Sequence, residues 1–140
     1  MKFVVDANVI LSALIADSMT RRLLVELEDD LLTPVYVHEE LENHIDLVVE
    51  KSGLTSTEVA SLIETIFTYV DVVPRSEVLG SLHEASRCLR DVDPDDALYL
   101  ATAIERDATI WSDDRDYREQ ELVPVTTTGE MVDRLEEQSG

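Results

Sequence analysis

The segment from Asp91 to Tyr117, DVDPDDALYLATAIERDATIWSDDRDY, carries carboxylates at both ends of an apolar stretch. Its pattern predicts a helix, then a short buried strand, then an acidic loop. Asp93 is a suitable N-cap for this helix, and Pro94 suits its first turn, where an N–H group would have no partner. The expected inner face of the helix is a narrow stripe of Ala97, Leu100, Ala101 and Ile104. A functional site, if the chain has one, is expected to centre on this segment.

Four acids occupy comparable positions in the predicted elements. Asp6 and Asp114 each follow a strand, whereas Glu40 and Asp96 lie early in helices. In a parallel sheet the carboxyl ends of strands and the N-termini of the following helices face the same edge, so these acids are expected to converge. Carboxylates that lie so near one another repel unless a proton or a cation lies between them. Mg²⁺ or Mn²⁺ suits such oxygen ligands, and a site of this kind typically serves phosphate chemistry.

Simpler explanations exist for each of these acids. Asp6, Asp95 and Asp96 lie at or near predicted helix N-termini, where the helix dipole favours a negative charge. In a chain with 31 Asp and Glu residues, some acids also align by chance. The spacing alone therefore leaves a metal site and a solvated acidic surface as alternatives. The three His and one Cys are too few for a usual zinc site, and no Gly-rich phosphate loop is present.

Short apolar runs alternate with helical patterns along the whole chain, which predicts an α/β fold with a parallel sheet between two layers of helices. No repeat or linker interrupts the pattern, so we expect a single domain over residues 1–140. Val70–Val73 fits either a strand or a surface loop. Pro124 limits the last run to an edge strand, because proline cannot donate to a ladder. The expected strands are Lys2–Val5, Leu31–Val37 with Pro34 inside it, Ala108–Trp111 and Leu122–Thr126.

The helices are predicted from their apolar spacing and from capping signals. Thr55-x-x-Glu58 and Thr127-x-x-Glu130 match the capping box, which predicts helix starts at these positions. Other expected helices follow Asp6, cover Thr20–Leu27, run through residues 38–51 to Gly53, and begin at Ser76 with Leu79, Leu82, Ala85 and Leu89 inward. Glu40 and His44 would share a face, and we expect His44 to make one hydrogen bond rather than bind a metal. The tail from Glu136 to Gly140 is expected to fray.

The net charge of −20, from 11 Lys and Arg against 31 Asp and Glu, is the unusual feature of the composition. It fits a chain that repels nucleic acid, or an acidic surface adapted to concentrated salt, where repulsion is screened. The acids are spread over nearly every predicted helix rather than massed in a tail, so we favour a cytoplasmic protein of a salt-loving organism. No apolar run is long enough to span a membrane. The single cysteine, Cys88, is expected to be a small buried hydrophobe.

Four segments together resemble a PIN domain, the small nuclease domain of VapC-type toxins and stand-alone archaeal proteins. They are FVVDANVILSALI at the start, EEL at 39–41, the DPDDALYLATAI helix and IWSDDRDY at 110–117. The resemblance implies a three-layer α/β/α fold with a five-stranded parallel sheet of order 3-2-1-4-5. It also implies Mg²⁺- or Mn²⁺-dependent cleavage of RNA, in which a metal-activated water attacks the phosphate in line.

Carried over by position, the resemblance implies a catalytic and metal-binding set of Asp6, Glu40, Asp96 and Asp114, with Asp116 as a fifth metal ligand. Asn8 and Ser112 would be supporting polar residues that orient carboxylates. Each carboxylate of the last three motifs has neighbouring competitors: Glu39 and Glu42 for Glu40, Asp95 for Asp96, and Asp113 for Asp114. The residues that follow, Leu41 and Ala97, favour Glu40 and Asp96.

The resemblance implies an RNA substrate and a homodimer, and for a toxin it implies an antitoxin protein as partner. One alternative is a non-catalytic scaffold that keeps the PIN fold to bind RNA or protein. Another is a phospho-acceptor domain, which would need a lysine near the last strand. The only lysines are Lys2 and Lys51, and neither lies there.

Overall fold

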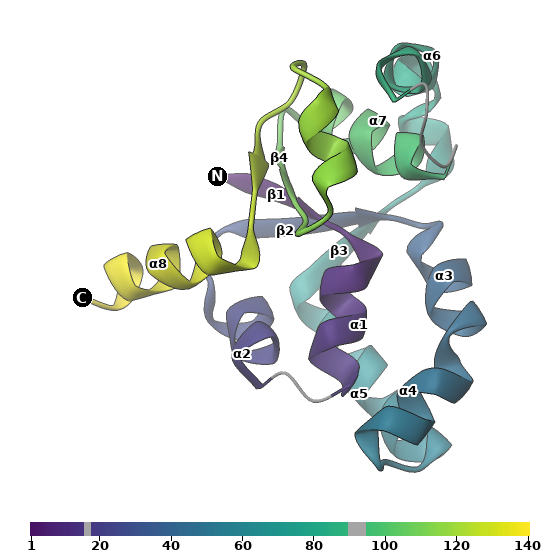
Figure 1. Ribbon diagram of the computed structural model, residues 1–140, viewed down its shortest axis with the longest axis vertical. Helices are drawn as coiled ribbons and strands as arrows, with labels where there is room; N and C mark the ends of the chain where they lie inside the picture. Colours follow the sequence, from purple (N-terminus) through teal and green to yellow (C-terminus); the bar gives the residue numbers. More distant parts are fainter. Residues whose placement is uncertain (16–17, 90–94) are drawn as a thin grey trace.

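The computed structural model describes residues 1–15, 18–89 and 95–140, and its centre is a five-stranded, all-parallel sheet (Figure 1). The strand order β3-β2-β1-β4-β5 confirms the expected 3-2-1-4-5 topology. The register pairs Val4 of the central strand with Leu32 on one side and Ile110 on the other. The strands are β1 (Lys2–Val5), β2 (Asp30–Pro34), β3 (Val70–Val73), β4 (Thr109–Trp111) and β5 (Val125–Thr126).

Helices cover both faces of the sheet, as the predicted α/β/α class requires (Figure 1). One layer consists of α6 and α7, and α7 contacts β1, β2 and β4 directly. The other layer contains α1, α2 and α5, with α8 against α2. The helices are α1 (Ala7–Ile15), α2 (Ser18–Glu26), α3 (Val37–Asn43), α4 (Ile45–Ser52), α5 (Ser56–Tyr69), α6 (Leu79–Cys88), α7 (Asp96–Arg106) and α8 (Thr128–Ser139); the 3₁₀ turns are η1 (Arg75–Glu77) and η2 (Arg115–Glu119).

The core lies on both sides of β1, where Phe3, Val4 and Val5 are all buried. A continuous apolar run suits a central parallel strand because helices cover both of its faces. Every residue from Ala97 to Ala103 on α7 is also buried, including the small residues that let this helix approach the sheet closely. The sheet and α7 therefore form a rigid base for whatever lies at the carboxyl ends of the strands.

The predicted helix over residues 38–51 is wrong as one element, because it divides at His44 into α3 and α4. His44 leaves the helical conformation, with φ −113° and ψ 7°, and its Nδ1 lies 2.7 Å from the carbonyl oxygen of Glu40. Since a carbonyl can only accept, Nδ1 donates this bond. This side-chain hydrogen bond is of the kind expected of His44. The helix end at Gly53 is confirmed, with φ +72° in the left-handed region that glycine tolerates.

Other expected boundaries move by a few residues. The chain after Pro74 first forms η1, which sets the register of α6 so that Val78, Ser81, Ala85 and Leu89 face the core. Leu79, predicted to be inward, is 53% exposed. The predicted last strand shortens to β5, which lies at the sheet edge as Pro124 requires. The tail remains helical to Ser139, and both predicted capping boxes are present. Asp91, Asp93 and Pro94 lie outside the described residues.

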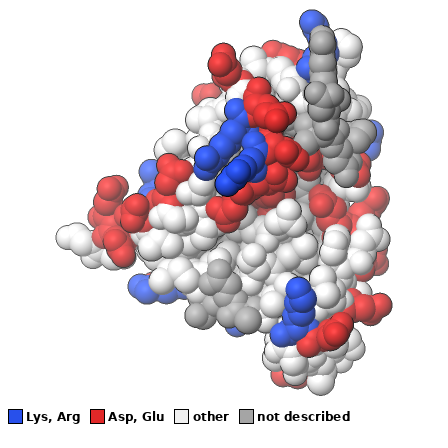
Figure 2. Space-filling model, in the orientation of Figure 1, with Lys and Arg blue, Asp and Glu red and all other residues white. Residues whose placement is uncertain are grey.

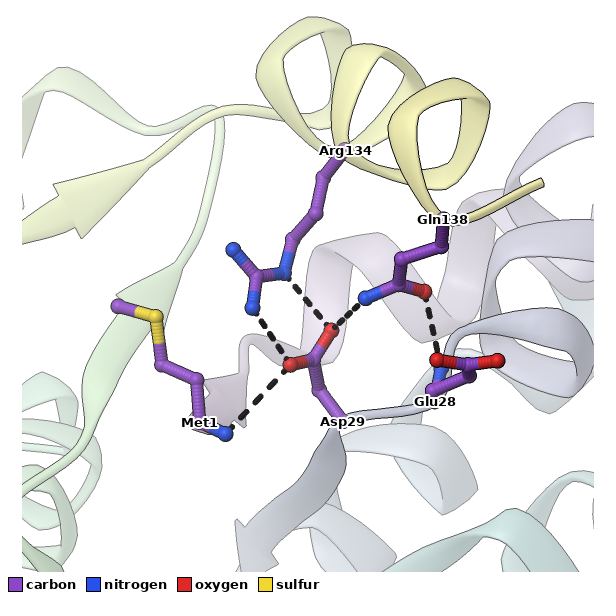
Figure 3. A network of polar contacts seen from close by, with 5 residues as sticks. All are labelled: Met1, Glu28, Asp29, Arg134 and Gln138. Atoms are coloured by element: carbon purple, nitrogen blue, oxygen red, sulfur yellow. Dashed lines mark hydrogen bonds and ion pairs between the residues drawn. The ribbon is translucent and has the colours of Figure 1, made fainter. Parts of the chain in front are cut away.

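The loop before β2 is tied to α8 by a buried carboxylate (Figure 3). Asp29, only 5% exposed, accepts two hydrogen bonds of 2.7 Å from the Arg134 guanidinium and one of 2.9 Å from Gln138. The Met1 ammonium lies 3.5 Å from the same carboxylate, and Gln138 also accepts from the backbone N–H of Glu28. These contacts, with Arg134 contributing most, lower the pKa of Asp29 to about 2. The C-terminal helix is therefore held onto the fold by charge as well as by its apolar face.

None of the helices in residues 1–15, 18–89 and 95–140 has both the length and the hydrophobicity needed to span a lipid bilayer. Cys88 packs against the core but is only half-buried, whereas the sequence predicted a buried side chain.

Candidate functional site

Asp6 lies at the junction of β1 and α1, at the carboxyl edge of the sheet. Its backbone N–H donates to the carbonyl of Trp111 at 3.0 Å, which places it beside the end of β4. Its carboxylate is 5% exposed and accepts a 2.8 Å hydrogen bond from the Ser112 hydroxyl and another from the backbone N–H of Asn8. The two explanations offered for Asp6 therefore coincide: it caps a helix and also lies in a cluster of acids.

Burial is the largest cause that raises the pKa of Asp6 from its ordinary 3.8 to about 6. Repulsion by Glu40 and Asp114 raises the pKa further, whereas the hydrogen bonds from Ser112 and Asn8 oppose the rise. A carboxylate that is buried beside two other acids is costly in its charged form. Such strongly perturbed groups concentrate at functional sites, although structural networks also produce them.

Asp96, Asp114 and Asp116 each offer a carboxylate oxygen, and these oxygens lie within 4.8 Å of one another. The loop that carries two of them is fixed by its own hydrogen bonds. The backbone N–H of Asp114 donates to the Ser112 hydroxyl at 3.0 Å, and the N–H of Asp116 donates to the Asp114 carboxylate at 2.9 Å. Ser112 therefore connects Asp6 to this trio, because its hydroxyl contacts both sides.

Two tyrosines that sequence reasoning did not identify orient the remaining acids. The Tyr99 hydroxyl donates to Glu40 at 2.5 Å, and the Tyr117 hydroxyl donates to Asp96 at 3.3 Å. Both side chains are 1% exposed. Burial, with the neighbouring acids, raises the pKa of Tyr99 and of Tyr117 far above the ordinary value, so both stay protonated as donors. The spacing of Tyr99, one helical turn after Asp96, was the signal available in the sequence.

The competing acids have other positions or partners. Glu39 and Glu42 are exposed on α3. Asp95 accepts a 2.6 Å hydrogen bond from the Tyr36 hydroxyl. Asp113 accepts from both the backbone N–H and the hydroxyl of Thr128, at 2.8 and 2.7 Å, and so caps the start of α8.

The two expected supporting residues, Ser112 and Asn8, both contact Asp6, but with different parts of the residue. Ser112 contacts the Asp6 carboxylate through its side chain, as expected for a residue that orients a carboxylate. Asn8 acts on Asp6 through its backbone N–H, and its side chain is exposed.

The arrangement gathers acids from the end of β1, from α3, from the start of α7 and from the loop after β4. Around Asp6 lie Glu40 and Asp114, and Asp114 in turn lies with Asp96 and Asp116. The trio of Asp96, Asp114 and Asp116 consists of oxygen donors alone, which hard divalent cations prefer. The edge of the sheet can therefore concentrate positive charge, which is the property a site for phosphate chemistry needs.

The family model described as PIN domain matches residues 4–135. No curated protein matches the sequence.

Similar folds occur in two solved structures of VapBC proteins. One is VapBC2 from Rickettsia felis bound to a DNA fragment from their promoter; the TM-score is 0.71 at 13% identity, over 91% of this chain and 98% of that one. The other is VapBC-1 from nontypeable Haemophilus influenzae; the TM-score is 0.69 at 13% identity, over 92% of this chain and 99% of that one. At this identity the likeness concerns the fold alone. Since the family model extends over nearly the whole sequence, this chain belongs to the PIN domain family.

Proposed function

We propose that this protein is a ribonuclease that hydrolyses phosphodiester bonds of RNA at the carboxylates of Asp6, Glu40, Asp96 and Asp114, with a divalent metal ion. The observation that carries the proposal is the convergence of acids from separate elements on the buried Asp6, whose pKa rises to about 6. A fold keeps such a repulsive group at a cost in stability, and the cost is explained if a cation occupies the site.

Mg²⁺ or Mn²⁺ is the proposed cofactor, and the ligands are Asp6, Glu40, Asp96, Asp114 and Asp116. The trio within 4.8 Å is close to what one ion requires, since ligands 2.1 Å from an octahedral Mg²⁺ are at most about 4.2 Å apart. When bound, the cation would activate water and neutralise the charge that develops on the phosphate. Its charge would also offset the repulsion by Glu40 and Asp114, which adds to the effect of burial in raising the pKa of Asp6.

The chain's own residues would then perform the positioning. Ser112 holds the Asp6 carboxylate at 2.8 Å and the start of the Asp114 loop at 3.0 Å, so it fixes these two acids relative to each other. Tyr99 holds Glu40 in the same way. Precise orientation of several carboxylates at once is what an in-line displacement at a phosphate demands.

Two variants test the proposal directly. Asp6→Asn and Asp96→Asn are expected to abolish metal-dependent cleavage of a labelled RNA while circular dichroism shows an unchanged fold. Glu39→Gln is the matched control, since it removes an exposed acid beside Glu40 and should leave cleavage intact. Cleavage that persists in both aspartate variants, or that survives EDTA, would reject the proposal.

Calorimetric titration with Mn²⁺ separates the enzyme from a non-catalytic scaffold of the same fold. The wild-type protein should bind Mn²⁺, and Asp96→Asn should bind it more weakly. A protein that binds no Mn²⁺ would favour the scaffold.

We further propose that the chain is the toxin of a pair of the VapBC kind, with an antitoxin protein as partner. The proposal is supported by the two VapBC structures of similar fold. A mostly apolar hollow of about 270 Å³ offers such a partner a surface near the acids. Its lining combines Pro34, Val35, Val78 and Leu98 with the polar side chains of Tyr36, His38, Glu39 and Arg75. A small overlapping gene directly upstream is the expected observation. A gene that stands alone would instead favour a role in RNA processing.

A homodimer is also proposed. Leu47 of α4 and Tyr69 of α5 are 40% and 45% exposed, which is high for apolar side chains of their size. Light scattering should give twice the mass of the chain, and a monomer at all concentrations would reject this part.

A further inference from the structure

Arg115 and Arg118 are two exposed cations of this acidic protein that have no partner among the described residues. Three other arginines are held in ion pairs with Glu26, Glu77 and Asp29, and Arg21 donates to the carbonyl of Ala13. Arg115 and Arg118 are exposed and form no ion pair or side-chain hydrogen bond with the described part of the chain. They lie beside Asp114, Asp116 and Glu119 in the sequence, yet they do not neutralise these acids.

Both arginines belong to η2, whose three-residue repeat gives the turn three distinct faces. Tyr117 and Gln120 form the buried face, at 1% and 7% exposure. Asp116 lies on a second face and joins the acidic trio. Arg115 and Arg118, three residues apart, share the third face, so two cations point outward next to the acids.

The segment that carries the arginines is firmly anchored. Gln120 donates from its side-chain amide to the carbonyls of Tyr117 and Val123, and accepts from the backbone N–H of Val123. At the other end, the Asp114 carboxylate caps η2 by accepting from the N–H of Asp116. The positions of the arginines relative to the acids are therefore set by the fold.

Figure 2 shows a group of blue Lys or Arg side chains directly beside a larger red group of Asp and Glu, on the face where Figure 1 draws the segment between β4 and β5. Arg115 and Arg118 are the only Lys or Arg residues between Trp111 and Thr128. The charge at this edge of the sheet is thus divided into an acidic centre and a basic rim.

We propose that Arg115 and Arg118 bind backbone phosphates of the RNA strand next to the phosphate that is cleaved. This inference rests on the proposed ribonuclease function and names residues that hold its substrate. A chain with a net charge of −20 repels a polyanion, so a substrate needs local cations close to the site. Guanidinium groups match phosphate oxygens through two parallel hydrogen bonds. Contacts to phosphate position the strand and carry no base preference.

The test compares the double variant R115Q/R118Q with two controls, using a fluorescein-labelled single-stranded RNA in Mn²⁺ at several KCl concentrations. R115K/R118K keeps both charges. K51Q/R87Q removes two other exposed cations, from α4 and α6. The glutamine variant is expected to raise KM about tenfold or more with little change in kcat. The slope of log(kcat/KM) against log[KCl] should become shallower by about 1.4, which is about 0.7 for each of two lost phosphate contacts on a single strand.

R115K/R118K should recover most of the salt slope, and K51Q/R87Q should behave as the wild type. Mn²⁺ binding, measured by calorimetry, should be unchanged in every variant. An unchanged KM and salt slope in R115Q/R118Q would overturn the inference, even if the wild type cleaves RNA as proposed.

If the wild type leaves the RNA intact, the ribonuclease proposal fails, and the same mixtures then report binding by fluorescence anisotropy. Weaker binding by R115Q/R118Q would still support the phosphate contacts, whereas equal binding would overturn them. A labelled single-stranded DNA of the same sequence gives a further check, because phosphate contacts should be lost equally with both strands. If R115Q/R118Q lost binding to RNA but not to DNA, the arginines would contact more than the phosphate groups.

Discussion

Replacing Asp6 by asparagine should stabilise the metal-free protein at neutral pH, although it should abolish the proposed ribonuclease activity. The pKa of Asp6 is about 6 in the fold and 3.8 in the ordinary, solvated state, with burial as the main cause. A shift of about 2 pKa units corresponds to about 3 kcal/mol. Because the folded state binds the proton more tightly, the charged form of Asp6 opposes folding above pH 6. Asparagine removes this charge, and its one carbonyl oxygen can still accept a hydrogen bond at this position.

The sign of the pH dependence follows from the same pKa values. Below pH 3.8 the carboxyl is protonated in both states, so its cost disappears; between pH 4 and 6 the cost grows; above pH 6 it is complete. After allowance for imperfect replacement by the amide, we expect Asp6→Asn to raise the free energy of unfolding by about 2 kcal/mol at pH 7, and by close to zero near pH 4.

The assay is urea unfolding followed by circular dichroism in EDTA, at pH 7 and pH 4, with the variant always compared to the wild type. Asp71→Asn is the control, since it removes an exposed acid from the edge strand β3. Adding Mn²⁺ at pH 7 should reverse the order, because only the wild type gains full metal binding. A destabilised Asp6→Asn at pH 7, or a difference that does not change with pH, would refute the electrostatic reasoning.

Three further predictions use other parts of the structure. Tyr99→Phe removes the donor to Glu40 and should lower Mn²⁺ affinity about tenfold in calorimetry, as loss of an outer-shell partner does, with the fold unchanged; unaltered affinity would deny Tyr99 a positioning role. Asp29→Asn should cost about 1–2 kcal/mol in urea unfolding at pH 7, because a pKa of about 2 in the fold means that stabilisation is present above 3.8 and is lost as pH falls through 2; an equal cost at pH 2 would contradict this. The melting temperature should rise from dilute buffer to molar KCl, since screening relieves the repulsion of a chain with charge −20, whereas a steady fall would contradict adaptation to salt.

Features that depend on local chemistry were predictable from the sequence. Both capping boxes are present as a four-residue sequence pattern predicted. The strand order is the one that the resemblance to PIN domains implied. Asp6 was expected at the sheet edge because it directly follows a strand, and Ser112 was named from the resemblance; the fold places their side chains 2.8 Å apart. The position of a residue in the sequence is enough to predict its place in the fold when the backbone topology alone determines that place.

Features that depend on side chains meeting across the fold were not predictable in this way. Tyr117 reads as an ordinary aromatic residue in a loop, and only the packing of η2 brings its hydroxyl to Asp96. Adjacent acids raise the same difficulty, because Asp113 and Asp114 are chemically equal in the sequence. The structure distinguishes them, because Asp113 accepts hydrogen bonds from Thr128, which lies 15 residues later in the sequence.

Whether the acidic composition excludes an RNA substrate depends on which cations are paired with acids in the fold. A net charge of −20 favours exclusion of RNA if charge is treated as uniform over the surface. The fold instead holds Arg22, Arg106 and Arg134 in ion pairs and Arg21 on a backbone carbonyl. It leaves Arg115 and Arg118 exposed within the same turn as Asp116. Because the three-residue repeat of η2 separates these charges onto different faces, one turn can serve a cation and a polyanion at once. An acidic surface and a nucleic-acid substrate are therefore compatible in this protein, provided that the arginines of this turn remain unpaired.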